Sequence, residues 1–443
     1  MDNQLAYIDQ GSFLGLRALG RGPHQQYVWV YDHDIDVDGL RRFHENMGHT
    51  LLGRRIERSP LPFGRHRWVA TPHQADLDVA PARRPRSELR KWLLEQSVIP
   101  VDPERGPSWR MAVVPFTEGG GAIMMMISHS VADGGAILGS VADAVMGKKR
   151  DFGYPAPHSR TTADAVWEDL RSSVKSLRDV GKAIKAAVQV ARSEKADIRS
   201  SAKRSVSRPI RDTAAAIAVP SITALVDIRA WDARVEALGG TSNALVAGIA
   251  ARLGKIRGRA EADGSVILNF PVSDRKDGDT RANALTGVSV TVNADESVSS
   301  LQKVRADIKA SLVGLNEEQN QLFETLALAP LMPKLLLRRL EGMALGAGYP
   351  VGCTNMGDFN PILLRLDGTD AQLFFARSPI EWPVTADILD RMGGVLVVAS
   401  ARIGSNLVLV ANGWQVGGVN TDQQLAADLL RALADFDLEG TCF

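Results

Sequence analysis

The sequence predicts an α/β protein with two lobes, each built on a mixed sheet. The chain has 443 residues, which is long enough for two domains of ordinary size. Its 45% hydrophobic and 23% charged residues are typical of a globular protein with a core. Strand patterns and helical patterns alternate through both halves, and hairpins recur too often for a doubly wound parallel sheet.

In the N-terminal half, residues 27–35 have a strand pattern and residues 38–48 a helical one, with Asp38 as its N-cap. A strand pair around a Pro–Gly turn is expected over residues 55–70 and a short helix over residues 87–97. A hairpin is expected over residues 109–130 and a second helix over residues 131–147. In the C-terminal half, we expect helices over 242–258, 297–330 and 421–436, the first capped by Ser242, and strands over 221–228, 266–275, 286–293, 395–404 and 407–419.

Charge divides the chain into three segments. Residues 1–150 contain 19 basic and 17 acidic side chains, residues 151–212 contain 13 and 8, and residues 213–443 contain 20 and 26. We therefore expect an N-terminal lobe over residues 1–150, a basic helical crossover over residues 151–215 and a C-terminal lobe over residues 216–443. The middle segment has apolar residues at helical spacing, and it is interpreted as a crossover or as a patch for an anionic membrane or an acidic partner.

The composition also excludes several classes of function. A net charge of +1 provides no basic field for nucleic acid. Two cysteines, Cys353 and Cys442, cannot form a disulfide framework or a zinc site, and no His-Glu-x-x-His motif is present. We expect a cytoplasmic protein without a metal, since neither a signal peptide nor an apolar run of about 18 residues is visible. Peripheral contact with a membrane stays open.

One segment places a histidine between a buried strand and a glycine-rich turn. The apolar run Ile123–Ile127 continues as Ser-His-Ser-Val-Ala-Asp-Gly-Gly, so His129 projects from the end of a rigid element. Asp133 can cap the following helix, and Gly134 allows a backbone or a substrate to approach closely. All eight histidines precede residue 159, so the C-terminal lobe cannot supply an imidazole base. Because a neutral imidazole is a good general base near neutral pH, His129 is a candidate catalytic residue, and the alternative is a buried histidine beside a helix-capping Asp133.

This segment resembles the HHxxxDG signature of the chloramphenicol-acetyltransferase-like superfamily. That superfamily includes nonribosomal peptide condensation domains, wax ester synthase/diacylglycerol acyltransferases and actinobacterial polyketide-associated acyltransferases. Further segments are similar to motifs of the wax ester synthase branch in the same order: residues 49–56, 101–111, 240–246, 270–275 and 352–357. The sequence departs from the family pattern at Ser128, which replaces the first histidine, at Ala244, and at residues 356–359.

The resemblance implies two chloramphenicol-acetyltransferase-like lobes arranged as a V around an active-site tunnel. It also implies transfer of an acyl group from acyl-CoA or an acyl carrier protein to the hydroxyl of a small-molecule or lipid acceptor, without a cofactor or an acyl-enzyme. In that reaction His129 is the general base. Asp133 gives structural support, paired with Arg275, and the backbone N–H groups of Gly134 and Gly135 are candidate donors to the oxyanion.

Four residues are expected to contact substrate: Ser128, Gly135, Thr354 and Asn355. Several alternatives stay open beside this interpretation. Asp133 could cap its helix without pairing, and Arg275 could be solvated. Met124–Met126 could line an acyl tunnel or belong to the core, and the apolar stretch 326–340 could contact a membrane or pack between the lobes. The protein could also form an amide, as a free-standing condensation enzyme, or be a non-catalytic scaffold that binds a carrier protein or a lipid.

Overall fold

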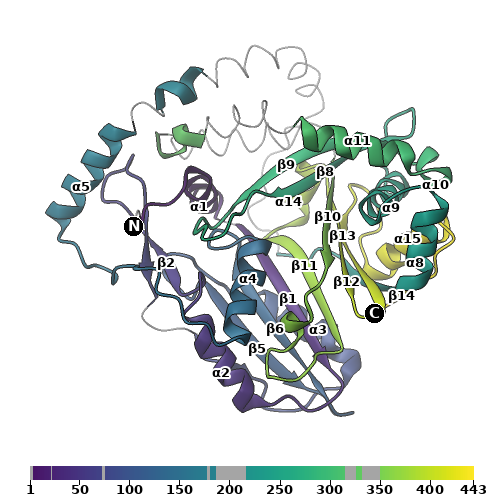
Figure 1. The fold of residues 1–443 in the computed structure, drawn as a ribbon, viewed down its shortest axis with the longest axis horizontal. Helices are drawn as coiled ribbons and strands as arrows, with labels where there is room; N and C mark the ends of the chain where they lie inside the picture. Colours follow the sequence, from purple (N-terminus) through teal and green to yellow (C-terminus); the bar gives the residue numbers. More distant parts are fainter. Residues whose placement is uncertain are drawn as a thin grey trace.

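The computed structural model describes residues 3–20, 22–71, 75–176, 180–185, 216–314, 326–331 and 350–443. In these residues the chain forms a five-stranded sheet, a seven-stranded sheet and a two-stranded hairpin. Figure 1 shows the two large sheets side by side, with helices on their outer faces. The predicted α/β architecture with two mixed sheets is therefore confirmed.

The five-stranded sheet has the order β11-β1-β6-β5-β4. Its centre is the predicted hairpin, made of β5 (Trp109–Pro115) and β6 (Gly121–Ser128), which lies beside β1 (Gly22–Tyr31). Strand β4 (Asp78–Val79) pairs in parallel with β5 at one edge. The three methionines of β6 are at most 3% exposed and belong to the core of this lobe, so the core interpretation of Met124–Met126 is correct.

Helices and a second hairpin surround this sheet. Asp36 caps α2 by accepting the N–H of Asp38, so the cap lies two residues before the predicted one. A 3-10 turn leads into α3, where a helix beginning at Ser87 was expected. The elements are α1 (Tyr7–Leu19), α2 (Val37–Met47), η1 (Arg86–Glu88), α3 (Leu89–Ser97), α4 (Gly134–Val145), β2 (Arg54–Glu57) and β3 (Arg67–Ala70).

The seven-stranded sheet has the order β14-β7-β13-β12-β10-β8-β9. Its strands are β7 (Ser221–Asp227), β8 (Ser265–Ser273), β9 (Leu285–Asn293), β10 (Val351–Asp358), β12 (Val395–Ile403), β13 (Asn406–Trp414) and β14 (Thr441–Cys442). Strand β10 is parallel to both of its neighbours, and the remaining pairs are antiparallel. The inward face of β12 and β13 contributes Ala401, Ile403, Val408 and Val410 to the core of the first lobe, which packs the lobes together.

Helices cover the outer face of this second sheet (Figure 1). Thr241 caps α9, where Ser242 was expected, by accepting the N–H of Ala244 at 3.2 Å. The helices of this half are α8 (Ile228–Ala237), α9 (Ser242–Ile256), α10 (Glu296–Ser299), α11 (Gln302–Val313), α14 (Ala386–Arg391) and α15 (Asp422–Ala434), together with the 3-10 turns η2 (Leu326–Leu331) and η3 (Pro361–Leu364).

One strand of the C-terminal half crosses over to the first sheet. Strand β11 (Leu373–Trp382) pairs antiparallel with β1 along most of its length. Phe374 of β11 stacks against Tyr27 and tilts onto Trp29, with ring centroids 6.1 and 5.1 Å apart. The linear division of the chain at residue 216 therefore does not describe the sheets, since residues 373–382 complete the sheet of the expected N-terminal lobe.

The crossover segment is described only in part. It begins as predicted with helix α5 (Thr162–Lys175), while residues 186–215 lie outside the described residues. Of the apolar stretch 326–340, only residues 326–331 are described: they form η2, which lies against α1, with Ala327 buried and Leu331 49% exposed. In the described part of the chain, no helix is both long and apolar enough to span a bilayer.

Candidate active site

His129 lies directly after the end of β6, and its backbone is held from two sides. Its N–H donates to the carbonyl of Pro23 at 3.0 Å, and its carbonyl accepts the side-chain N–H of Asn283 at 3.3 Å. The residue is half-buried between two buried serines, and its ring has no hydrogen-bond partner among the described residues. The imidazole is thus carried by a fixed backbone.

Asp133 links the turn after His129 to the second half of the chain. Its carboxyl is fully buried, and Oδ1 accepts the N–H of Ala136 at 2.8 Å and Nη2 of Arg275 at 2.9 Å. Its Oδ2 accepts the N–H of Ala284 at 2.7 Å, and its own N–H donates to Ala282 at 2.8 Å. Both roles considered from the sequence occur together, because Asp133 caps α4 and also pairs with Arg275.

Arg275 is not solvated, since its side chain is only 15% exposed. Besides Asp133, its guanidinium donates to three carbonyls, those of Asp279, Arg281 and Ala282, each at 3.1 Å. These carbonyls belong to the loop between β8 and β9, residues 274–284, which we call the bridging loop. Arg275 therefore folds the bridging loop around itself and fastens it to Asp133.

Asp9 and Asn283 reinforce this connection, and neither was predicted from the sequence. Asp9 of α1 is fully buried and accepts the backbone N–H groups of Ala282 and Asn283 at 2.9 and 2.8 Å, as well as the Asn283 side chain at 3.1 Å. Burial raises the pKa of the Asp9 carboxyl, and these donors together with Arg54 offset part of the rise. Asp9 thus orients the amide of Asn283, which in turn holds the carbonyl of His129.

Arg54 of β2 also holds the bridging loop and the turn after His129 together. Its guanidinium lies 3.9 Å above the ring of Trp68 and is fully buried. It donates to the carbonyl of Thr280 in the bridging loop at 2.5 Å and to the carbonyl of Val131 at 3.3 Å. Arg54 lies within one of the segments that resembled the family, but a contact with residues 131 and 280 has no signal in local sequence.

Gly134 and Gly135 form the first two positions of α4, where helical N–H groups lack an intrahelical acceptor. The N–H of Ala136 is taken by Asp133, whereas those of Gly134 and Gly135 have no acceptor among the described residues. The Tyr27 hydroxyl lies near Gly134, on the side where a side chain at that position would project. Two backbone donors and the positive end of the helix dipole are therefore available close to His129 for a developing oxyanion.

Ser128, which replaces the first histidine of the motif, is paired in register with His24 on β1. Residues opposite each other on neighbouring strands project from the same face, so the His24 imidazole lies beside Ser128. Burial lowers the pKa of His24 to about 4, which leaves its imidazole neutral at neutral pH. A buried neutral histidine thus adjoins the position at which the motif lacks one.

Thr354 and Asn355 lie on β10 and project from opposite faces of the sheet, because neighbours on a strand alternate. Cys353 packs in the core of the second lobe, which places Thr354 on the face that carries Ala401 toward the first lobe. Asn355 donates its side-chain N–H to Asn243 of α9. Thr354 therefore faces the first lobe and Asn355 faces the outer helices, so the structure does not bring them together as a pair.

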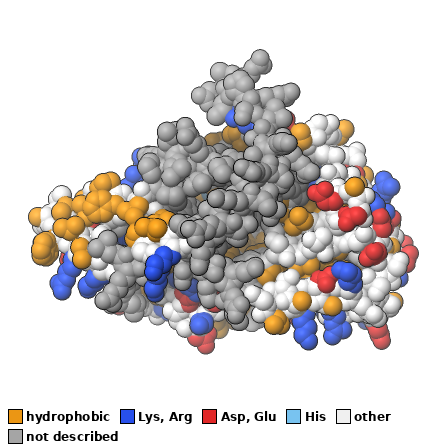
Figure 2. Space-filling model, turned by 90° about the horizontal axis from the view of Figure 1, so that it is seen from above, with side chains coloured by type: hydrophobic (Ala, Val, Ile, Leu, Met, Phe, Trp, Pro, Cys, Tyr) orange, Lys and Arg blue, Asp and Glu red, His pale blue; other side chains and the backbone are white. Residues whose placement is uncertain are grey.

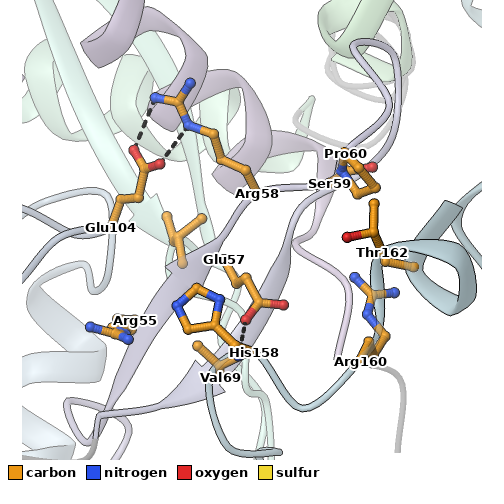
Figure 3. A pocket seen from close by; sticks show the side chains of 12 residues that line it. Arg55, Glu57, Arg58, Ser59, Pro60, Val69, Glu104, His158, Arg160 and Thr162 are labelled. Atoms are coloured by element: carbon orange, nitrogen blue, oxygen red, sulfur yellow. Dashed lines mark hydrogen bonds and ion pairs between the residues drawn. The ribbon is translucent and has the colours of Figure 1, made fainter.

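None of these residues lines the two surface pockets of about 380 and 390 Å³. The first pocket lies between the β2–β3 hairpin and the start of α5 (Figure 3). Its side chains are largely engaged with one another: Arg58 pairs with Glu104, and Glu57 accepts the backbone N–H of His158 at 2.7 Å. Across the described residues, no three His, Cys, Asp or Glu side chains come together as a metal site.

Asp133→Ala and Arg275→Ala should each lower the free energy of unfolding by about 3–5 kcal/mol, because each leaves a buried charge without its partner. The double variant should lose less than the sum of the two, because neither charge is then left alone. Urea denaturation measures all three. A cycle between Asp133 and Arg281, a half-buried arginine of the same loop that pairs with Asp274 and Asp279, is the control and should show no coupling. A coupling near zero for Asp133 and Arg275 would refute the pairing.

Asn283→Ala removes the contacts to Asp9 and to the His129 carbonyl. We expect a loss of about 1–3 kcal/mol in unfolding free energy, as for a buried hydrogen-bonding group. If Asn283 positions His129, kcat should fall at least roughly tenfold with little change in KM, because only the reacting geometry is affected. Asn269→Ala, at an exposed site on β8, is the matched control. An unchanged kcat for Asn283→Ala would show that the contact is structural only.

Comparison with solved structures shows that the whole chain has a known fold. The first condensation domain of the CDA synthetase matches 99% of this chain and 97% of its own, with a TM-score of 0.59 and 17% identity. The wax ester synthase/diacylglycerol acyltransferase from Marinobacter aquaeolei VT8 matches 98% and 99%, with a TM-score of 0.57 and 15% identity. The epimerization domain from the third module of tyrocidine synthetase B matches 98% and 95%, with a TM-score of 0.53 and 13% identity.

No family model and no curated protein matches the sequence. At these low identities the likeness to solved structures concerns the fold. It agrees with the order of the sequence motifs and with two mixed sheets that contact each other through β11, β12 and β13. The chain therefore has the fold that is seen in solved condensation domains and in a wax ester synthase/diacylglycerol acyltransferase.

Proposed function

We propose that the protein is an acyltransferase that moves an acyl group from a thioester donor to an acceptor hydroxyl, with His129 as general base. The observation that carries the proposal is the place of His129. Its ring is free of hydrogen bonds to the described residues, its backbone is held by both halves of the chain, and two unengaged N–H groups begin the next helix. The fold shared with condensation domains and with a wax ester synthase supports acyl transfer in general.

The reaction follows from this arrangement. The neutral imidazole of His129 removes the proton of the acceptor hydroxyl while its oxygen attacks the thioester carbonyl. Negative charge collects on the carbonyl oxygen, where the N–H groups of Gly134 and Gly135 stabilise it. The tetrahedral intermediate then collapses, the carbon–sulfur bond breaks, and the departing thiolate takes the proton from His129. An ester and a free thiol result, and no cofactor is needed.

The donor is acyl-CoA or a phosphopantetheinyl carrier protein, and the acceptor is a small molecule or a lipid. The similarity to condensation domains supports a carrier-bound substrate, and the similarity to the wax ester synthase supports a hydroxyl acceptor. Thr354 is the residue of the second lobe that we propose to contact substrate, with Ser128 and Gly135 from the first. Asn355, which bonds to Asn243 and to the N–H of Gly357, would shape the end of β10 instead.

An amine acceptor is the second candidate, because the fold of condensation domains supports it and the same base could serve. A competition between a hydroxyl and an amine of matched size, with one acyl thioester donor, separates the two by the mass of the product. The ester is the expected product. A product that is only the amide would move the protein to the condensation type, and no product with any donor would favour a non-catalytic scaffold.

His129→Ala should lower turnover of an acyl thioester by roughly 10²–10⁴-fold, the usual contribution of a positioned general base. The melting temperature should change little, since the ring has no hydrogen-bond partner among the described residues. His158→Ala, at an exposed position, is the control and should keep full turnover. Near-wild-type turnover in His129→Ala would falsify the assignment.

Incubation with a thioester donor alone should leave the protein without a covalent acyl group, as measured by intact mass spectrometry. Burial raises the pKa of the Cys353 thiol far above its usual value, which keeps it protonated and unreactive, and burial also raises the pKa of Cys442. Ser128 and Ser130 are buried beside His129, with no serine–histidine bond among the described residues. A stoichiometric adduct would require a ping-pong scheme in place of direct transfer.

A further inference from the structure

Helix α5 carries an exposed apolar face far from the active site. Val166, Trp167, Leu170 and Val174 are 36%, 68%, 41% and 59% exposed. At about 100° per residue these four side chains fall within one arc of roughly 100° on the helix. Monomeric proteins rarely expose apolar side chains in such a contiguous group, which therefore indicates an interaction surface.

The opposite face fixes α5 to the rest of the molecule. Ala165 and Asp169 are buried, and Asp169 pairs with Arg160 at 2.8 Å. The hydroxyl of Ser172 donates to the side chain of Gln4 at 2.7 Å, which ties the helix to the N-terminal segment. Helix α5 is therefore packed against the protein through one face while its apolar face stays exposed.

Positive charge lies next to this face and continues beyond it. Arg171 and Lys175 on α5 and Lys182 and Lys185 after it are all exposed. Glu168 and Asp169 share one cation, Arg160, and Asp164 accepts the hydroxyl of the uncharged Thr161. The sequence from residue 171 to 212 contains 12 Lys and Arg against 4 Asp and Glu. Among the described residues, the excess of positive charge beside the apolar face therefore comes from Lys182 and Lys185.

The space-filling view shows the same combination. In Figure 2, hydrophobic side chains gather at the end of the molecule where α5 lies in Figure 1, with Lys and Arg side chains beside them. Trp167 is the most exposed of the four apolar residues, whereas five other tryptophans of the chain are at most 3% exposed. Tryptophan is enriched where an apolar layer meets water, since its ring is amphipathic.

We propose that α5 docks onto the surface of an anionic phospholipid membrane. The 14-residue helix would lie in the plane of the interface, with Trp167, Leu170 and Val174 inserted among the acyl chains and the cations against the headgroup phosphates. A second copy of this chain fits less well, because docking through this face would bring like charges such as Lys182 and Lys185 of the two copies toward each other. The proposal does not depend on the chemistry at His129.

Co-sedimentation of the full chain with vesicles tests the proposal. The protein should bind vesicles of phosphatidylcholine with phosphatidylglycerol and should bind phosphatidylcholine alone far more weakly, and binding should weaken as salt screens the charges. Trp167→Glu should reduce binding roughly tenfold or more, because it removes a large apolar group from the interface and adds a negative charge. Arg171→Gln and Lys175→Gln should each reduce it roughly fivefold.

Val419→Glu makes the same change of charge at another exposed apolar residue, in the loop after β13, and should leave binding unchanged. His129→Ala should bind vesicles like the wild type, which separates this result from the proposed catalysis. Equal binding to both kinds of vesicle, or no binding to either, would overturn the proposal. So would a Trp167→Glu variant that binds vesicles normally but loses a concentration-dependent dimer in sedimentation velocity, because the face would then be an interface between copies.

Discussion

The buried carboxyl of Asp133 joins the two halves of the chain at the active site. It caps the helix that follows His129, and it also accepts Arg275 and the N–H of Ala284 from the bridging loop. A fully buried carboxyl is stable only when hydrogen bonds and a counter-charge replace water, so the bridging loop has to be in place for the His129 turn to be in place. Asp9 and Arg54 act in the same direction, since each bonds to the bridging loop. Arg54 also donates to Val131 in the His129 turn, and Asp9 reaches that turn through Asn283.

Both halves of the chain hold the proposed general base, His129, in a fixed position. His129 belongs to the first sheet, but its carbonyl is held by Asn283 of the bridging loop. The face of the second sheet that carries Thr354 looks toward the first lobe. Rigid support of this kind is what positioning of a reacting group requires.

Local pattern was enough to predict the parts of the site that are contiguous in sequence. The hairpin β5–β6, the turn with His129 and the start of α4 follow from an apolar run, a glycine cluster and a capping aspartate. The pair between Asp133 and Arg275 came from the resemblance to a family, because its members lie 142 residues apart. Thr354 and Asn355 came from the same source, but alternation along β10 separates them.

Other features left no signal in the sequence because they depend on pairings over long distances. Strand β11 joins the first sheet by pairing with β1, which lies some 350 residues away, and a strand pattern does not specify its partner. Asp9 is one acidic residue on a helix, and its bonds to residues 282 and 283 exist only after both halves have folded. The caps of α2 and α9 were misplaced by two residues and one residue, since neighbouring Asp, Ser and Thr side chains can all cap a helix.

A crystal structure with a non-hydrolysable ketone analogue of an acyl-CoA bound, in which a methylene group replaces the thioester sulfur, tests the central claim most directly. The account predicts that the acyl carbonyl lies between the lobes beside His129, with its oxygen roughly 3 Å from the N–H groups of Gly134 and Gly135. An acyl group bound elsewhere, such as in the pocket between β2–β3 and α5, with His129 out of reach of the carbonyl carbon, would contradict it.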